Sequence, residues 1–345
     1  MPALALVAIF LAAAAVIWAA GIKLSDATDA LDARLGLGSA LGGLLVLAIA
    51  TNLPEIAITV TAAAAGNVGL AVGNLVGGIA IQTLVLALLD ARAGRVPLTY
   101  RVGSLTVVLE AGIVLATVTA AVGTAQLPSS AAVAGISPGS VAILAIWLGG
   151  LAIVNAARAG LPWKASAPGA SAGRSATDRA KGAEPQPFKG RSTGFVVGVL
   201  AAASIATLAG GIAIEETGSR LAEDIGLTGA VFGATILAAS TALPEVSTGL
   251  ASIKLGDYGL AFSDIFGGNA FLPVLFLLAD AVAGTPALPS AQRTDVWMAA
   301  LGILLTAIYV VGLVLRPRRK IAGLGVDSLV AVVAYAVGIV GLATI

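Results

Sequence analysis

Apolar runs of about 20 residues recur along the whole chain, and this feature limits its possible folds more than any other. Because a helix of that length crosses the hydrocarbon core of a bilayer, each run is a candidate transmembrane span. Only 11% of the 345 residues are charged, whereas soluble domains carry about 25%. We therefore predict an all-α polytopic protein embedded in a lipid bilayer. Its ten predicted transmembrane helices cover residues 2–22, 37–65, 69–90, 102–122, 139–157, 194–214, 227–253, 258–280, 295–315 and 322–344.

The basic residues lie almost entirely on one side of these predicted helices. The loops after helices 1, 3, 5, 7 and 9 hold 17 of the 19 Lys and Arg residues, and only Arg220 and Arg293 remain on the other side. By the positive-inside rule the basic side is cytoplasmic. We predict a multi-pass protein of the cell (inner) membrane, with both termini extracytoplasmic. The segment 158–193 is rich in Ser, Gly, Pro, Lys and Arg, which predicts a flexible cytoplasmic linker.

The chain contains no Cys and no His. This excludes thiolate and imidazole metal ligands, and it excludes nucleophilic sites that use Cys or a Ser–His pair. A metal ion bound here must be held by oxygen atoms, which suits hard cations such as Ca²⁺, Mg²⁺ or Na⁺. We expect inorganic cations as partners, and neither a nucleic acid nor a resident cofactor.

The two halves of the chain repeat each other at an offset of 190 residues. The matching positions carry Gly, Pro, Thr and acidic residues, not just the common apolar ones: Gly21 with Gly211, Thr51-Asn52-Leu53-Pro54-Glu55 with Thr241-Ala242-Leu243-Pro244-Glu245, Gly66 with Gly256, and Asp90 with Asp280. Each half, 1–157 and 194–345, has five spans. An odd number inverts the second half, so we predict inverted-topology repeats, which in transporters place the substrate site at their interface near the midplane.

The repeated motif places an ionisable group deep in spans 2 and 7. Such a group is costly in a membrane and normally faces the protein interior with a partner. The preceding proline, Pro54 or Pro244, cannot donate a backbone hydrogen bond and predicts a kink that leaves carbonyl oxygens free. Two carboxylates, two hydroxyls and an amide then share one region and predict an oxygen cage for one divalent cation. The side chains concerned are Glu55, Glu245, Thr51, Thr241 and Asn52.

Glycine-rich stretches follow in spans 3 and 8, at residues 73–78 and 263–269. Small residues let helices approach closely, which explains the glycines by packing alone. Polar residues accompany them, however, and Asn74, Gly78 and Gln82 share one helix face whose repeat mates are Asp264, Gly268 and Leu272. We expect polar atoms of this stripe to complete the cage opposite the glutamates. The candidates are Asn74, Gln82, Asp264 and Asn269.

These paired motifs resemble those of the Ca²⁺:cation antiporter superfamily, in its sodium/calcium exchanger type. That family carries Gly-Thr-Ser-x-Pro-Glu followed by Gly-Asn-x-x-Gly-Ser-Asn in each half, and here the motif regions are 48–82 and 238–272. The resemblance implies that Glu55 and Glu245 are central Ca²⁺ ligands. It also implies that Thr51, Thr241 and the carbonyls of Ala48 and Ala238 serve cation sites, and that helices 1 and 6 slide across the other eight during alternating access.

The sequence departs from the family pattern at several oxygen ligands. Asn52 and Ala242 replace the motif serines, and Gly78 and Gly268 replace the downstream serines. Gln82 and Leu272 stand where the family has Asn or Asp, and Asp264 stands where it has Asn. The first half is therefore the more polar side of the predicted site. We predict Ca²⁺ extrusion driven by Na⁺, while the missing oxygens leave the number of coupled ions open.

Four other functions are compatible with parts of this pattern. Proton coupling is the first alternative, because burial disfavours the charged form of a carboxyl group. Another transported cation, such as Mg²⁺, Mn²⁺ or Na⁺ alone, is the second. An intramembrane aspartyl protease also needs two buried acids, but its Gly-x-Gly-Asp signature is absent. A non-transporting membrane homologue with an altered site is the fourth.

Overall fold

A computed structural model describes residues 2–35, 49, 51–159, 188–224, 226, 232–254, 256–342 and 344. The predicted linker lies mostly outside the described residues, as do most of predicted span 2 before Thr51 and the carbonyl of Ala48. The first half contains α1 (Ala3–Leu35), α3 (Leu53–Ala64), α4 (Val68–Arg92), α5 (Leu98–Arg101), α6 (Thr106–Thr124), η1 (Ser129–Ala131) and α7 (Pro138–Ala159). The second half contains α9 (Thr193–Asp224), η2 (Gly233–Leu237), α11 (Ala238–Thr241), α12 (Leu243–Lys254), α13 (Tyr258–Phe271), η3 (Leu272–Val274), α14 (Leu275–Ala283), η4 (Leu288–Ser290), α15 (Arg293–Leu315), β1 (Lys320–Ile321), β2 (Leu324–Gly325) and α16 (Val326–Leu342).

Described helices lie at the positions of all ten predicted spans. Among the described residues, seven helices are long and apolar enough to cross a bilayer. An eighth span is the pair Thr235–Thr241 and Leu243–Lys254, which is bent by 45°. The shorter apolar helices α3 and α16 complete the ten. The helix α1 continues to Leu35, well past the predicted end at residue 22, because the polar segment after it contains no Gly or Pro to stop a helix.

The repeat is visible in the local geometry as well as in the sequence. The turn between α3 and α4 has Gly66 at φ +77°, and the turn between α12 and α13 has Gly256 at φ +73°. Such positive φ values favour glycine. After each glycine a side chain caps the next helix: Asn67 accepts from the Leu70 N–H and Asp257 from the Leu260 N–H. Matching turns at an offset of 190 residues confirm that the two halves fold alike.

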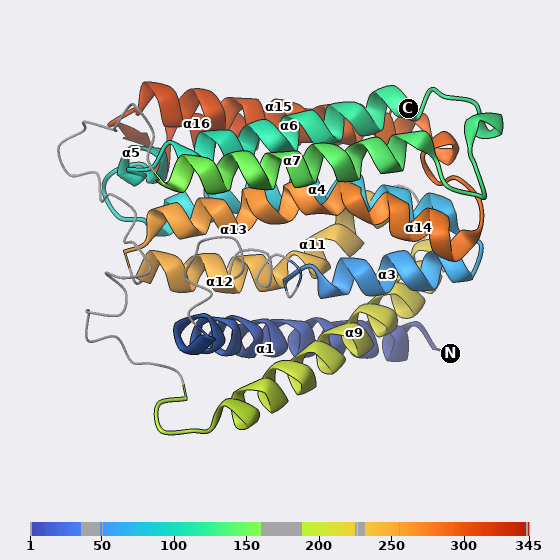
Figure 1. Ribbon diagram of the computed structural model, residues 1–345, viewed down its shortest axis with the longest axis horizontal. Coiled ribbons are helices and arrows are strands. Elements are labelled where there is room, and N and C mark those ends of the chain that lie inside the picture. The colour runs from blue at the N-terminus through green and yellow to red at the C-terminus, as the bar shows by residue number, and fades with distance from the viewer. Residues whose placement is uncertain are drawn as a thin grey trace.

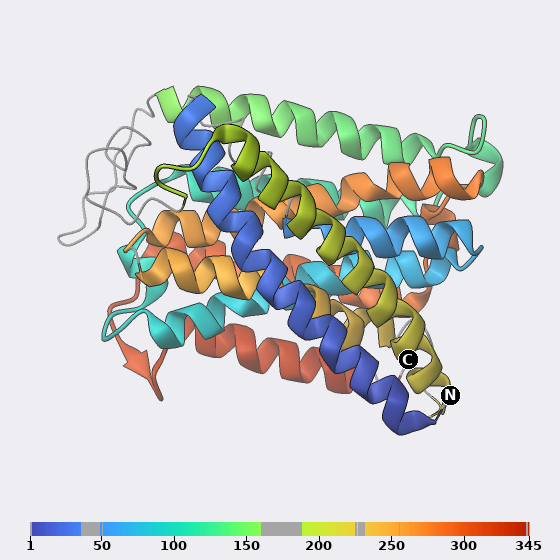
Figure 2. The same ribbon diagram turned by 90° about the horizontal axis from the view of Figure 1, so that it is seen from below.

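The two halves run in opposite directions through one bundle. In Figure 1, α12 and α3 lie along one line. The helix α12 lies towards the end that carries α5, and α3 lies towards the end that carries both termini. The long helices α1 and α9 pack against each other and cross this bundle obliquely as a pair, which Figure 2 shows most clearly. Each member of the pair crosses the motif helix of the other half, since α1 contacts α12 and α9 contacts α3.

Two buried aspartates at the ends of the third and eighth spans accept hydrogen bonds from neighbouring loops. The Asp90 carboxylate accepts hydrogen bonds from the backbone N–H groups of Leu98 (2.6 Å) and Gly325 (2.5 Å), and it forms an ion pair with Lys320 (3.2 Å). Its repeat mate Asp280 is likewise fully buried. Asp280 accepts from the backbone N–H groups of Ser137 (2.8 Å) and Ala287 (2.6 Å) and from the Ser140 hydroxyl (2.8 Å). Each carboxylate therefore links loops to the end of a helix by hydrogen bonds, Asp90 at one end of the bundle and Asp280 at the other.

We expect Asp280→Ala to destabilise the protein strongly. The change leaves two buried backbone N–H groups and a hydroxyl without their acceptor, at about 1–3 kcal/mol for each group. The matched control is Asp26→Ala, which removes an exposed i,i+3 ion pair with Lys23 that contributes about 0–1 kcal/mol. Thermal unfolding in detergent measures both variants. An apparent Tm for Asp280→Ala equal to that of Asp26→Ala would show that the hydrogen bonds of Asp280 do not stabilise the fold.

Candidate cation-binding site

The repeated motif starts a helix at the centre of the bundle in both halves. Leu53 and Leu243 begin α3 and α12, and the following proline occupies the first turn, where its missing N–H removes no helical bond. In the second half, Thr235–Thr241 and Leu243–Lys254 meet at a 45° bend just before this proline. Glu55 and Glu245 then fall in the first turn of their helices. The positive end of each helix dipole partly offsets the cost of burying these carboxylates.

The two glutamates are fully buried and lie close together. Both side chains are 0% exposed, and their carboxylates repel each other electrostatically. Thr241 lies beside the Glu55 carboxylate, and Thr51 lies beside the Glu245 carboxylate. Each threonine therefore approaches the glutamate of the opposite half. This exchange of partners brings all four motif side chains into one site between the repeats.

A third acid adjoins Glu245 on the second half. Asp264 in α13 is 3% exposed, contacts the Thr248 hydroxyl and repels the Glu245 carboxylate. Thr248 itself donates to the Glu245 carbonyl (3.2 Å). Thr248 is not among the site residues predicted from the sequence, although its position three residues after Glu245 places it on the same helix face. The repeat mates of Thr248 and Asp264 are Ile58 and Asn74, so this acidic extension exists in one half only.

Two amides adjoin Glu55 on the first half. The Gln82 amide nitrogen donates to Glu55 Oε1 at 3.2 Å. Asn52 and Gln82 both lie against Gly268, where a Cβ atom would be 3.0 Å from Asn52 Nδ2 and 3.5 Å from Gln82 Oε1. The glycine in α13 thus makes room for two amides of the opposite half.

The remaining predicted site residues have different surroundings. Asn74 is fully buried with no hydrogen-bond partner among the described residues. Asn269 links the repeats by donating to the Thr83 hydroxyl (2.9 Å) and the Ile79 carbonyl (3.3 Å), while its own side-chain oxygen accepts no hydrogen bond in the described part of the chain. The Ala238 carbonyl already accepts from Ala242 N–H (3.1 Å) and from the Thr241 hydroxyl (3.2 Å). A cation at Ala238 would displace that hydroxyl.

The side chains around Glu55 and Glu245 provide mainly oxygen atoms as possible cation ligands. Within the described ranges, Glu55 Oε2, Gln82 Oε1 and Asn269 Oδ1 are buried acceptors without a hydrogen bond. Buried polar atoms normally have partners, so a concentration of open acceptors around two carboxylates suits a bound cation. The described residues contain no group of three or more Asp, Glu, His or Cys arranged to hold a metal.

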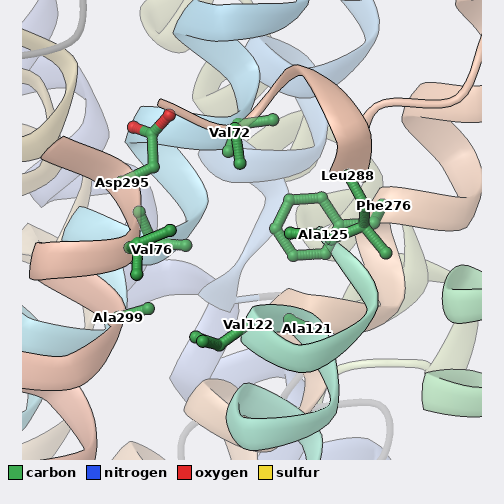
Figure 3. Close-up of a pocket in the computed structure, with 11 residues that line it drawn as sticks. Val72, Val76, Ala121, Val122, Ala125, Phe276, Leu288, Asp295 and Ala299 are labelled. Atoms are coloured by element: carbon green, nitrogen blue, oxygen red, sulfur yellow. The ribbon is translucent and has the colours of Figure 1, made fainter. Parts of the chain in front are cut away.

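A separate pocket lies away from these residues, between α4, α6, α14 and α15 (Figure 3). Its volume of about 20 Å³ has room for roughly one water molecule. Its lining is apolar except for Asp295, whose carboxylate caps α15 by accepting from the Gln292 N–H (2.7 Å). None of the predicted site residues lines this pocket, and it does not resemble a cation site.

Comparison with known proteins agrees with this architecture. The family model described as sodium/calcium exchanger protein matches residues 5–154 and 193–343. A search of curated proteins finds no match. The crystal structure of the H⁺/Ca²⁺ exchanger CAX is similar with a TM-score of 0.69 at 12% identity, over 99% of this chain and 82% of that one. The sodium-calcium exchanger NCX_Mj, soaked with Na⁺ and Sr²⁺, gives 0.60 at 16% identity over 98% of this chain and 99% of that one. At these identities the likeness shows the fold.

Proposed function

The chain belongs to the sodium/calcium exchanger family and is an integral membrane cation antiporter rather than an enzyme, and we propose that it extrudes Ca²⁺ in exchange for Na⁺. One observation carries this proposal: Glu55 and Glu245 are fully buried side by side between the inverted repeats. Two adjacent buried carboxylates need compensating positive charge. One Ca²⁺ supplies it in one state, and monovalent ions supply it after Ca²⁺ has left.

The ligands we propose for Ca²⁺ are carboxylate, hydroxyl and amide oxygens. Glu55 and Glu245 provide the negative charge, Thr51 and Thr241 the hydroxyls, and Asn52 and Gln82 the amide oxygens of the first half. Ca²⁺ accepts six to eight such oxygens in a flexible geometry. The sodium-calcium exchanger NCX_Mj, whose fold this chain shares, has been soaked with Na⁺, Ca²⁺ and Sr²⁺. That chemistry supports, by fold analogy, a hard-cation substrate here.

We propose that α1 and α9 are the moving part of an alternating-access cycle. They pair with each other and cross both motif helices, so a shift of this pair would open the site first to one side and then to the other. The end that carries α5 also carries the C-terminal ends of α4 and α12, with the basic residues Arg92 and Lys254 (Figure 1). We propose that this end faces the cytoplasm, with both termini on the outer side.

Exchange against protons is the second candidate. The observation that favours it is Leu272, which is the repeat mate of Gln82 and supplies no side-chain oxygen where the first half has an amide. A buried carboxylate without neutral ligands for Na⁺ can instead be neutralised by a proton.

Ion flux in proteoliposomes of the purified full chain separates the two candidates. We expect Ca²⁺ uptake into Na⁺-loaded vesicles, with no dependence on an imposed pH gradient at constant Na⁺. Vesicles carrying Glu55→Gln provide the background leak. Uptake that follows a pH gradient and ignores Na⁺ would overturn Na⁺ coupling in favour of proton coupling. Absence of Ca²⁺ flux under both gradients would contradict antiport of Ca²⁺ altogether.

A further inference from the structure

Two segments at the α5 end of the bundle, residues 92–105 and 316–325, carry only basic residues among their charged side chains. The first contains three arginines, and the second contains three arginines and one lysine. The fold joins them although they are far apart in the sequence, because Arg316 Nη2 donates a hydrogen bond to the Tyr100 carbonyl at 2.5 Å. We call the two segments together the basic surface.

Two arginines of the basic surface contact the ring of Tyr100. The Cζ atoms of Arg316 and Arg318 lie 5.6 and 5.4 Å from the ring centroid, which is within the range of cation–π interactions. Arg318 Nε also donates to the Tyr100 hydroxyl at 3.2 Å. The tyrosine therefore holds two guanidinium groups close to each other.

These contacts orient the two guanidinium groups without neutralising their charge. Neither Arg316 nor Arg318 forms an ion pair with a carboxylate in the part of the chain that the structure describes. Lys320 differs, because it pairs with the buried Asp90 at 3.2 Å. Arg318 is exposed and donates to the other described residues only through Nε. Its two terminal nitrogens are therefore open to an external anion.

Exposed aliphatic side chains adjoin the basic surface. Val314 and Leu315 at the end of α15 are 61% and 74% exposed, and Ile321 in β1 is 53% exposed. The apolar helix α15 ends at Leu315, so Arg316 follows at once. Basic residues directly after an apolar span lie at the depth of the lipid head groups, with the span itself in the hydrocarbon.

We propose that the basic surface binds the phosphate group of an anionic phospholipid in the adjoining leaflet. Arginine suits phosphate because its planar group donates two parallel hydrogen bonds. Clusters of basic residues next to a membrane span also attract anionic lipids. The exposed aliphatic side chains favour a lipid over a soluble phosphate, since they contact its acyl chains. This binding is separate from the ion exchange proposed above.

Native mass spectrometry of the purified full chain in a neutral detergent tests the inference. The probes are dioctanoyl phosphatidylglycerol, which is anionic, and dioctanoyl phosphatidylcholine, which has no net charge. We expect Arg316→Gln combined with Arg318→Gln to raise the Kd for phosphatidylglycerol by at least about tenfold and to leave that for phosphatidylcholine unchanged. The matched control is Arg220→Gln combined with Arg293→Gln, which removes the same charge from exposed positions in α9 and at the start of α15.

The possible outcomes decide the inference. A double variant of the basic surface that binds phosphatidylglycerol as tightly as the wild type would overturn it. An equal loss of affinity in the control would also overturn it, because net charge would then account for the binding. Displacement of phosphatidylglycerol by an equal concentration of inorganic phosphate would assign the surface to a soluble anion instead. If the double variant does not fold, Arg318→Gln alone decides, with an expected rise in Kd of at least about threefold. No rise in that variant would contradict the lipid site.

Discussion

Glu55→Gln and Glu245→Gln are each expected to weaken Ca²⁺ binding by about 100-fold or more. Each substitution keeps the shape of the side chain but removes one of the two buried negative charges that would compensate a divalent ion. In a site closed to water, a lost charge is poorly replaced by solvent. Isothermal titration calorimetry with CaCl₂ on the purified chain measures the affinity. Thermal unfolding with and without Ca²⁺ reports whether the ion still stabilises the fold.

The control for these variants is Glu216→Gln, the same change at an exposed position of α9. It is expected to bind Ca²⁺ with the wild-type affinity. If the glutamate variants retained wild-type affinity while Glu216→Gln lost it, the acidic residues of α9, and not the central pair, would hold the ion.

Gly21→Val is expected to slow exchange by about tenfold or more while Ca²⁺ binding changes little. Gly21 in α1 meets Pro244, where a Cβ atom would lie 3.0 Å from the proline Cα, and its repeat mate Gly211 meets Pro54 at 3.3–3.4 Å. A side chain at Gly21 must push α1 away from the core, and overpacking of this kind costs about 1–3 kcal/mol. Each 1.4 kcal/mol changes a rate by about tenfold. Conformations that differ in this contact therefore change strongly in relative free energy, and the exchange rate changes with them.

Two controls accompany this prediction. Gly198→Val places the same side chain in α9 where a Cβ atom meets nothing within 4 Å, so transport is expected to be unchanged. Gly211→Ala is expected to be milder than Gly21→Ala, since its contacts are longer. The measurements are ⁴⁵Ca²⁺ flux in proteoliposomes and equilibrium binding in detergent. A Gly21→Val protein that transports at the wild-type rate would show that α1 does not move across Pro244.

The number of spans and their order followed from the sequence because hydropathy is a local property. Six predicted spans agree with described helices to within a few residues: 69–90, 102–122, 139–157, 258–280, 295–315 and 322–344. The helices α1 and α9 continue to Leu35 and Asp224, beyond the predicted ends at residues 22 and 214. The predicted spans 37–65 and 227–253 are described only from residues 49 and 232. The predicted kink was also local, since proline is disfavoured inside a helix and accepted in its first turn, so a new helix starts there. It appears as the break at Ala242 between α11 and α12. The end of α1 was missed because a helix can continue through a more polar segment that contains no Gly or Pro.

The repeat determined which residues are equivalent, and thus that Glu55 and Glu245 are a pair. It did not determine what each of them contacts. The expectation that the Ala238 carbonyl serves a cation came from resemblance alone, and the structure shows hydrogen bonds at that carbonyl. Asp90 and Asp280 showed only as matching acids at helix ends, whereas their acceptor roles depend on loops that arrive from other parts of the chain.

The sequence by itself therefore determined the membrane class, the ten spans, the inverted repeat and the pair of buried glutamates. Each of these depends on residue type and spacing along the chain. Only the tertiary structure decided that Thr241 lies beside Glu55 and Thr51 beside Glu245, and that Leu272 packs on Gly78 while Gln82 packs on Gly268. These contacts join residues about 190 positions apart, and their partners are selected by the packing of two inverted halves, which no local pattern encodes.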